Sequence, residues 1–340
     1  MKQHQHRTMG EFLRDVARAE VDPTYASRTI GMNTATGADG GFAVPEELLV
    51  DLTSSIFQSS PLLSRVTRIP IVEGNELAAF VPDESIGTIS GGQMGGLNLD
   101  EVPAGEDIST EIVSLRGLRL PLVKNAAVLF VTNEMREDAA QLDAFFQTVG
   151  ARSVRGLLER RVWKGSGAGQ ALGVTASSAL KKQAIESTQT IANSAQFIGI
   201  NAAKMLSQML DIESAAFYIN PDLFTSLLTA TAGGTAKDVI TPPDVDAPFG
   251  RIATRPLFPN YAAQPIGTVG DFVCASMSNY LVTTKGDSKP VLSTHVRYLQ
   301  DESAYRIRVR WNGQPMLSAP FAPEHSTAEK SHYVALAARS

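Results

Sequence analysis

The glycine-rich stretch at residues 165–170, GSGAGQ, comes closest in composition to a phosphate-binding loop. Such loops hold an anion with backbone N–H groups and the positive end of a following helix, so they follow a strand and precede a helix. Here an apolar repeat of helical spacing precedes the glycines, and the Lys-Ser/Thr ending of a nucleotide-binding loop is missing. The stretch is therefore predicted to end a helix, with Gly165 and Gly167 in the left-handed region of φ.

Residues that could form a metal centre or a catalytic site are scattered. Neither the HExxH zinc motif nor the Gly-x-Ser-x-Gly elbow of a serine hydrolase occurs, and the single cysteine, Cys274, excludes a disulfide within the chain and a cysteine-cluster metal site. Five histidines are spread along the chain, at His4, His6, His295, His325 and His332. We predict no catalytic residues, no metal ligands and no cofactor, and the chain is not expected to be an enzyme.

The longest regular element is predicted between Leu142 and Lys164. Apolar residues recur there at spacings of three and four, which places them on one stripe of a helix with the arginines largely outside it. The stripe consists of Leu142, Phe145, Phe146, Val149, Val154, Leu157, Leu158 and Val162. At 1.5 Å per residue this helix would be roughly 35 Å long, which is unusual for an ordinary domain of this size.

Charge is distributed unevenly along the chain. No Lys or Arg lies between Arg68 and Arg116, whereas nine acidic residues lie from position 73 to position 111. Strand-like stretches at 76–82 and 108–122 flank the centre of this segment, which is too rich in glycine to support a core. A protein that folds alone rarely keeps ~40 residues outside its core, so we predict a protruding acidic hairpin that reaches another molecule. The alternative is an acidic surface loop without defined structure.

Basic residues alternate with apolar ones near the C-terminus. Tyr305, Ile307, Val309 and Trp311 alternate with Arg306, Arg308 and Arg310, which predicts a strand with one apolar and one basic face. The basic face either contacts water or binds acidic segments of another copy of the chain.

The remaining segments predict an arm followed by a mixed α+β body. Residues 9–20 begin with capping-box spacing and form a short amphipathic helix, which packs on its own core or docks on a neighbour, and residues 33–41 have the composition of a linker. Further predicted elements are a helix from Pro45 to about Pro61, a strand at 64–72, a helix at 197–210, a buried strand at 215–219 and a helix that begins with Asn220-Pro221.

Composition limits the classes of function. At 340 residues more than one subdomain is expected, and 43% hydrophobic residues are sufficient for their cores. No run of 18 apolar residues and no signal peptide occurs, so neither membrane insertion nor secretion is expected. The net charge of −5 argues against tight binding to nucleic acid, which requires clustered Lys and Arg.

Several motifs in order resemble the major capsid proteins of tailed bacteriophages. They are GGFAVPEELL at 40–49, TNEMRED at 132–138 before the long helix, GSGAGQALG at 165–173, AFYINPDLF at 216–224 and VGDF at 269–272. The resemblance implies the α+β, HK97-like capsid fold, in which the long helix is the spine of a peripheral domain. By this resemblance, residues 1–44 are an N-terminal arm and linker, 45–72, 117–205 and 285–340 the peripheral domain, 73–116 an extended loop, and 206–284 an axial domain.

The resemblance also implies a function. The chain would assemble as pentamers and hexamers into an icosahedral phage head that encloses double-stranded DNA through weak, non-specific contact, inside the cytoplasm of a bacterial host. Separate scaffold and portal proteins, and decoration proteins, would be its partners, because only about 40 residues precede GGFAVP and leave no room for a fused scaffold unless the chain has been shortened. The alternative is an encapsulin-like compartment that encloses a cargo enzyme.

Contacts between subunits are the one kind of site that the sequence predicts. We expect opposite charges to fix the register of the acidic hairpin of one copy on the long helix or the arginine strand of the next. The candidate residues are Asp100, Glu101, Glu106, Asp107, Arg152, Arg155, Arg161, Arg306, Arg308 and Arg310. Some members of the resembled family join a loop lysine covalently to a neighbour's asparagine; this hairpin has no lysine, so a non-covalent shell is expected.

Overall fold

The computed structural model describes residues 56–83, 102, 114–138, 142–185, 195–223, 240–241, 249–286, 290–323, 326 and 328–338. All of them belong to one unit of the chain, residues 52–340. The predicted arm and linker, most of the helix predicted after Pro45, and the centre of the acidic hairpin lie outside the described residues. The elements that are described form a mixed α+β architecture, as the sequence predicts.

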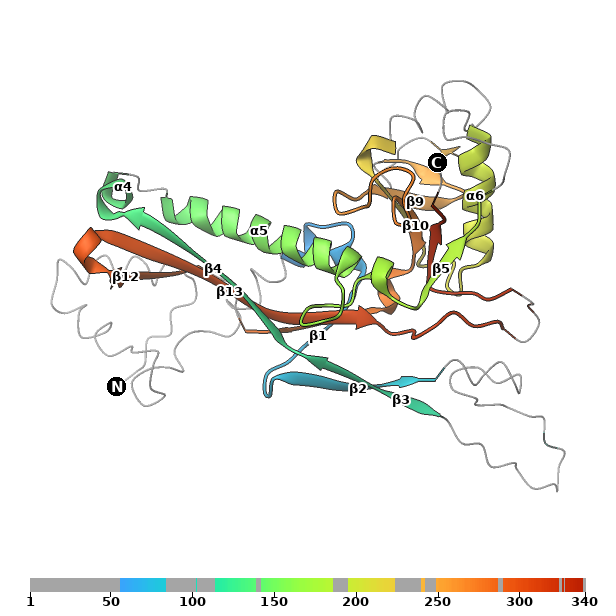
Figure 1. The fold of residues 1–340 in the computed structure, drawn as a ribbon, viewed down its shortest axis with the longest axis horizontal. Helices are drawn as coiled ribbons and strands as arrows, with labels where there is room; N and C mark the ends of the chain where they lie inside the picture. Colours follow the sequence, from blue (N-terminus) through green and yellow to red (C-terminus); the bar gives the residue numbers. More distant parts are fainter. Residues whose placement is uncertain are drawn as a thin grey trace, which may run out of the picture. The chain divides into compact units, whose positions relative to one another are not determined.

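A long sheet contains the arginine strand at its centre. Its strands are β1 Thr67–Pro70, β4 Val123–Thr132, β11 Tyr280–Lys285, β12 Val291–Arg297 and β13 Glu302–Pro315. Strand β13 pairs with β4 along one edge, and along the other edge it pairs first with β12 and then with β11. Figure 1 shows β4 and β13 side by side over most of their length. The predicted alternation of β13 is confirmed, because Tyr305, Val309 and Trp311 are buried while Arg306 and Arg308 are exposed.

The predicted long helix is confirmed as α5, Leu142–Lys164, which follows the short helix α4, Asn133–Asp138 (Figure 1). Its second half is buried through Val154, Leu158, Val162 and Trp163. Its first half packs less completely: the ring of Phe146 lies 4.6 Å from that of Tyr305 on β13, whereas Phe145 is 58% exposed and Val149 is also exposed. The apolar stripe thus extends beyond the part of α5 that the described residues cover.

The glycine-rich stretch does end α5, but one of its two glycines acts differently from the prediction. Gly167 has a φ of +80°, as expected, whereas Gly165 is not among the described residues with positive φ. Instead, a Cβ atom at Gly165 would lie 2.1 Å from the carbonyl oxygen of Ala171 and 2.6 Å from that of Arg161. Gly165 is required because the chain folds back against the helix end without room for a side chain.

A second sheet, here called the buried sheet, forms the other core. It runs in the order β5-β14-β10-β6-β9-β8-β7, and all four residues of β6, β10 and β14 are buried. The predicted helix at 197–210 is α6, Ala195–Ser207, whose Ala202 and Met205 join this core. The strand bounds are β5 Leu180–Gln183, β6 Ala216–Ile219, β7 Ile240–Thr241, β8 Arg251–Ile252, β9 Arg255–Pro259, β10 Phe272–Ala275 and β14 Tyr333–Leu336. Cys274 is buried within β10, as predicted.

The base of the acidic hairpin is described and is packed within the subunit. Strands β2, Glu76–Pro82, and β3, Leu115–Pro121, form an antiparallel pair, which agrees with the predicted hairpin. The inward-facing Leu118 and Leu120 form a small core with Leu281 of the long sheet. The expectation that the hairpin lies outside any core is therefore wrong for its base, because alternate residues of β3 are apolar and reach β11.

Shorter elements modify the remaining predictions. The strand predicted at 64–72 is β1 alone, and residues 63–65 before it form a 3-10 turn. The cap predicted at Asn220 is confirmed, since its side-chain oxygen accepts a hydrogen bond of 2.9 Å from the N–H of Asp222. The 3-10 helices are η2 Leu63–Arg65, η3 Val174–Ala176, η5 Met277–Asn279 and η6 Tyr298–Gln300.

The connection from β10 to β11 joins the two sheets through a polar cluster. The carboxylate of Asp211 accepts hydrogen bonds from the hydroxyls of Ser214 and Ser276, and the N–H of Ser276 donates to the carbonyl of His332. Burial acts to raise the pKa of Asp211, but these hydrogen bonds outweigh it and hold that pKa below its usual value, while burial lowers the pKa of His332. Because Ser276 is fully buried, this meeting of acid, serine and histidine fastens the sheets together and is closed to a substrate.

The predicted domain ranges do not follow the two sheets strand by strand. Strands β5 and β14 lie within ranges assigned to the peripheral domain, yet they pair within the buried sheet beside β10. The domain ranges remain a prediction. Among the described residues no helix is both long and apolar enough to cross a membrane.

Candidate inter-subunit surface

One face of the long sheet carries a group of cations that are distant in sequence. Directly opposed residues of neighbouring strands lie on the same face of a sheet. Arg310 of β13 is opposed by Lys124 on β4 and by Lys285 on β11, so three cations lie in one row across three strands. Arg308 and Arg306 follow on the same face, two and four residues further along β13.

This basic face has little compensation within the part of the subunit that is described. None of its five cations forms an ion pair with a described carboxylate; Lys285 donates a hydrogen bond of 2.6 Å to the carbonyl of Gly74 instead. Like charges directly opposed across strands are unfavourable. A segment of negative charge placed over the row Lys124, Arg310 and Lys285 would remove that repulsion.

The basic face continues into apolar surface at its far end. Arg306 is opposed by Val128 on β4 and by Val291 on β12, and both valines are exposed. Phe130, two residues after Val128, is partly covered by the guanidinium of Arg297, which lies 3.8 Å from the ring centroid and pairs with Glu302 at 2.7 Å. The face therefore combines exposed cations and exposed aliphatic groups, which suits an acidic segment that also carries apolar residues.

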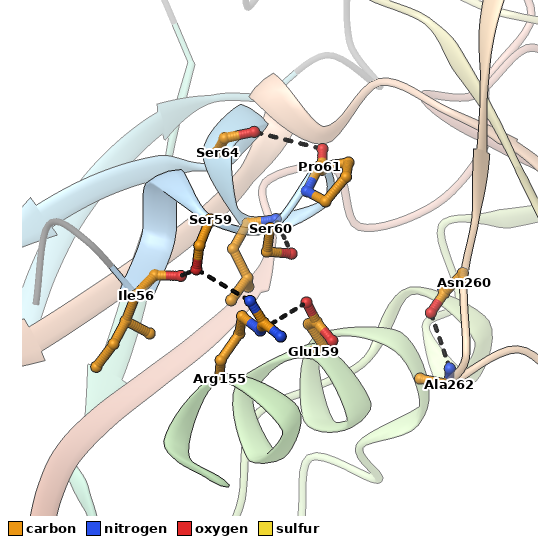
Figure 2. A network of polar contacts seen from close by, with 10 residues as sticks. Ile56, Ser59, Ser60, Pro61, Ser64, Arg155, Glu159, Asn260 and Ala262 are labelled. Atoms are coloured by element: carbon orange, nitrogen blue, oxygen red, sulfur yellow. Dashed lines mark hydrogen bonds and ion pairs between the residues drawn. The ribbon is translucent and has the colours of Figure 1, made fainter. Parts of the chain in front are cut away.

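The predicted arginines of α5 differ in how they are used. Arg152 is exposed and has no ion-pair partner among the described residues. Figure 2 shows Arg155 between Ser59 and Glu159: it donates to the Ser59 hydroxyl at 3.2 Å and lies 3.9 Å from the Glu159 carboxylate. Arg155 thus joins α5 to the segment that precedes β1.

Arg161 is also engaged within the subunit. Its guanidinium donates a hydrogen bond to the side-chain oxygen of Gln170, the last residue of the glycine-rich stretch. Reversing the charge of Arg155 and Arg161 would consequently break contacts inside the subunit as well as any contact between subunits. The exposed Arg306 and Arg308 offer a cleaner test of the predicted interface.

The acidic half of the predicted interface, Asp100, Glu101, Glu106 and Asp107, lies outside the described residues. Sequence reasoning missed Lys124 and Lys285, because each is an isolated lysine in its own segment. The signal that reveals them is the register of β4, β13 and β11, which places both beside Arg310.

The fold can now be compared with known proteins. Solved structures similar to this chain include the capsid of an empty GTA particle computed with C5 symmetry, at 13% identity and a TM-score of 0.56, covering 91% of this chain and 99% of that one. Chains from Microbacterium phage Oxtober96, at 14% identity and a TM-score of 0.53, and from Mycobacterium phage Bobi, at 11% and 0.52, each cover 82% of this chain and 90% of their own. No curated protein matches.

At these low identities the solved structures establish the HK97-like fold alone. The family comparison extends further, because the model of the phage capsid family matches residues 40–324, which is most of the chain. The chain therefore belongs to the phage capsid family and is a structural protein of a capsid.

Proposed function

We propose that copies of this chain assemble as pentamers and hexamers into an icosahedral head that encloses double-stranded DNA. The family match over residues 40–324 is the observation that carries this proposal. Assembly takes place in the cytoplasm of a bacterial host, with separate scaffold and portal proteins as partners and decoration proteins as additional ones. A capsid is favoured over an encapsulin-like compartment because the similar solved structures are named as phage or GTA capsids.

The contact that we assign to the acidic hairpin is the basic face of the long sheet in the next copy. Two features favour this face over α5: Arg306 and Arg308 are exposed, and the row formed by Lys124, Arg310 and Lys285 repels itself until an anion covers it. The segment 97–113 supplies both acidic and apolar residues, in LNLDEVPAGEDISTEIV, and so matches both parts of the face. Each exposed pair contributes only about 0.2–1 kcal/mol, but every subunit repeats the contact.

Binding of the enclosed DNA is weak and non-specific in this proposal. Tight binding would require clusters of Lys and Arg that neutralise many phosphates, and the chain has a net charge of −5. A wall of this charge allows DNA to enter and leave the head without strong adhesion.

Self-assembly is the first expected outcome. Purified full-length protein, alone or with its scaffold, should form rings or closed shells, because the acidic hairpin is expected to gain its stabilisation from other copies. Light scattering and electron microscopy across a range of salt and protein concentrations would detect them. A monomer of 36.4 kDa under every condition would contradict the proposal.

The shell should also be held together without covalent bonds between subunits. Residues 69–115 contain no lysine that could form an isopeptide link, and the nearest downstream lysine is Lys124 in the long sheet. Assembled particles that are boiled in denaturant should migrate as single subunits on a gel. A ladder of covalent multimers would show that a cross-link forms elsewhere in the chain.

A further inference from the structure

A closed loop at residues 260–271 joins β9 to β10. Its two ends are held beside the end of β6: the N–H of Asn260 donates to the carbonyl of Ile219 at 2.8 Å, and the N–H of Asn220 donates to the carbonyl of Asp271, also at 2.8 Å. A loop of this length whose ends lie together, and which packs on its own residues, is an Ω-loop.

Hydrogen bonds fix the interior of this loop. The side-chain oxygen of Asn260 accepts from the N–H of Ala262 at 2.9 Å, an interaction shown in Figure 2, and the carbonyl of Gln264 accepts from the side-chain amide of Asn220 at 2.8 Å. The carboxylate of Asp271, which is buried, accepts from the N–H of Gly267 at 2.8 Å. The loop is therefore rigid before any partner binds it.

This rigid loop presents a large aromatic side chain to the outside. Tyr261 is 88% exposed although the residues on both sides of it are tied down by hydrogen bonds. Ile266, at the other end of the loop, is 41% exposed. Rigid aromatic residues are typical anchors of protein interfaces, because they bury much apolar area and lose little conformational entropy on binding.

The loop lies in a region without charge. Charged residues make up 19% of the chain, yet residues 256–270 contain none, and neither do residues 165–180. These two segments meet where Gly270, with a φ of +103°, packs so closely that an added Cβ would lie 3.0 Å from the methyl group of Thr175. Interface cores are depleted of charge because an unpaired charge is costly to bury.

From these observations we infer that the loop 260–271 is a contact site for a second copy of this chain, with Tyr261 as its anchor. The inference rests on the proposed assembly, which supplies the second copy. An uncharged surface suits such a partner, since wherever copies meet near a symmetry axis the same surface is repeated and its own charges would repel. The contact is separate from the basic face, which acts through charge.

Replacing Tyr261 with serine tests the anchor in the full-length chain. Loss of an interface anchor should raise the protein concentration needed for assembly by about tenfold or more, whereas Tyr261→Phe, which keeps the ring, should stay within about twofold of the wild type. Neither change should alter the melting temperature of the unassembled subunit, because the side chain is exposed. A photo-cross-linking residue at position 261 should form a bond to a second copy, identified by mass spectrometry.

The outcomes separate the two proposals. If the wild type assembles and the serine variant assembles at the same concentration, the loop is not a contact site, although the capsid function stands. A cross-link formed only within one chain would also overturn the inference. If the wild type forms no particles under any condition, the proposed function itself is wrong, and the inference falls with it.

Discussion

Replacing Gly165 with alanine is expected to destabilise the isolated subunit by about 3 kcal/mol or more, the range in which single substitutions disrupt a core or a backbone contact. The new Cβ would lie 2.1 Å from the carbonyl oxygen of Ala171 and 2.6 Å from that of Arg161. Both obstacles are backbone atoms, so no side chain can move aside to relieve the clash. Thermal or chemical denaturation of unassembled protein would measure the loss.

Gly156 provides the matched control for this variant. It lies within α5, and a Cβ atom there would meet nothing within 4 Å. Gly156→Ala should therefore stabilise the subunit by about 0.5–1 kcal/mol, since alanine loses less backbone freedom than glycine when a helix forms. Equal stability of the two variants would show that the chain at the end of α5 is not packed as described.

Reversing two exposed charges, Arg306→Glu with Arg308→Glu, is expected to abolish assembly at low salt while the subunit remains folded. The change places two negative charges where the proposed contact with the acidic hairpin requires positive ones, and every copy repeats the repulsion. Added salt should restore some assembly, because ions screen exposed charges over about 10 Å at 0.1 M. Particle yield by light scattering at several salt concentrations, with circular dichroism of the subunit, measures both effects.

Two further variants make this test specific. Lys182→Glu with Lys204→Glu makes the same change in net charge at exposed lysines outside the long sheet and should leave assembly largely intact. Lysine at Asp100 and Glu101 should partly rescue the reversed arginines if these acids are the partners. Normal assembly of the Arg306/Arg308 variant at low salt would remove this contact from the proposal and leave the family assignment unchanged.

The local elements were readable from the sequence because their signals lie within a few residues. The apolar spacing of three and four between Leu142 and Lys164 predicted α5 with the observed bounds, and the period of two in 305–311 predicted the two faces of β13. The hairpin strands and the cap at Asn220 followed in the same way. Each pattern reflects which side chains point to one side of a single helix or strand.

The contacts between distant segments required the tertiary structure. Nothing in the sequence near Lys124 or Lys285 connects them to Arg310; strand register does so. Likewise, the spacing of Arg155 and Arg161 placed them outside the apolar stripe, but their binding to Ser59 and Gln170 depends on where the chain returns. Gly165 was recognised as a helix stop, yet its physical reason was the close approach of Ala171 rather than a positive φ. Periodicity is a property of one segment, whereas pairing and close packing are properties of two.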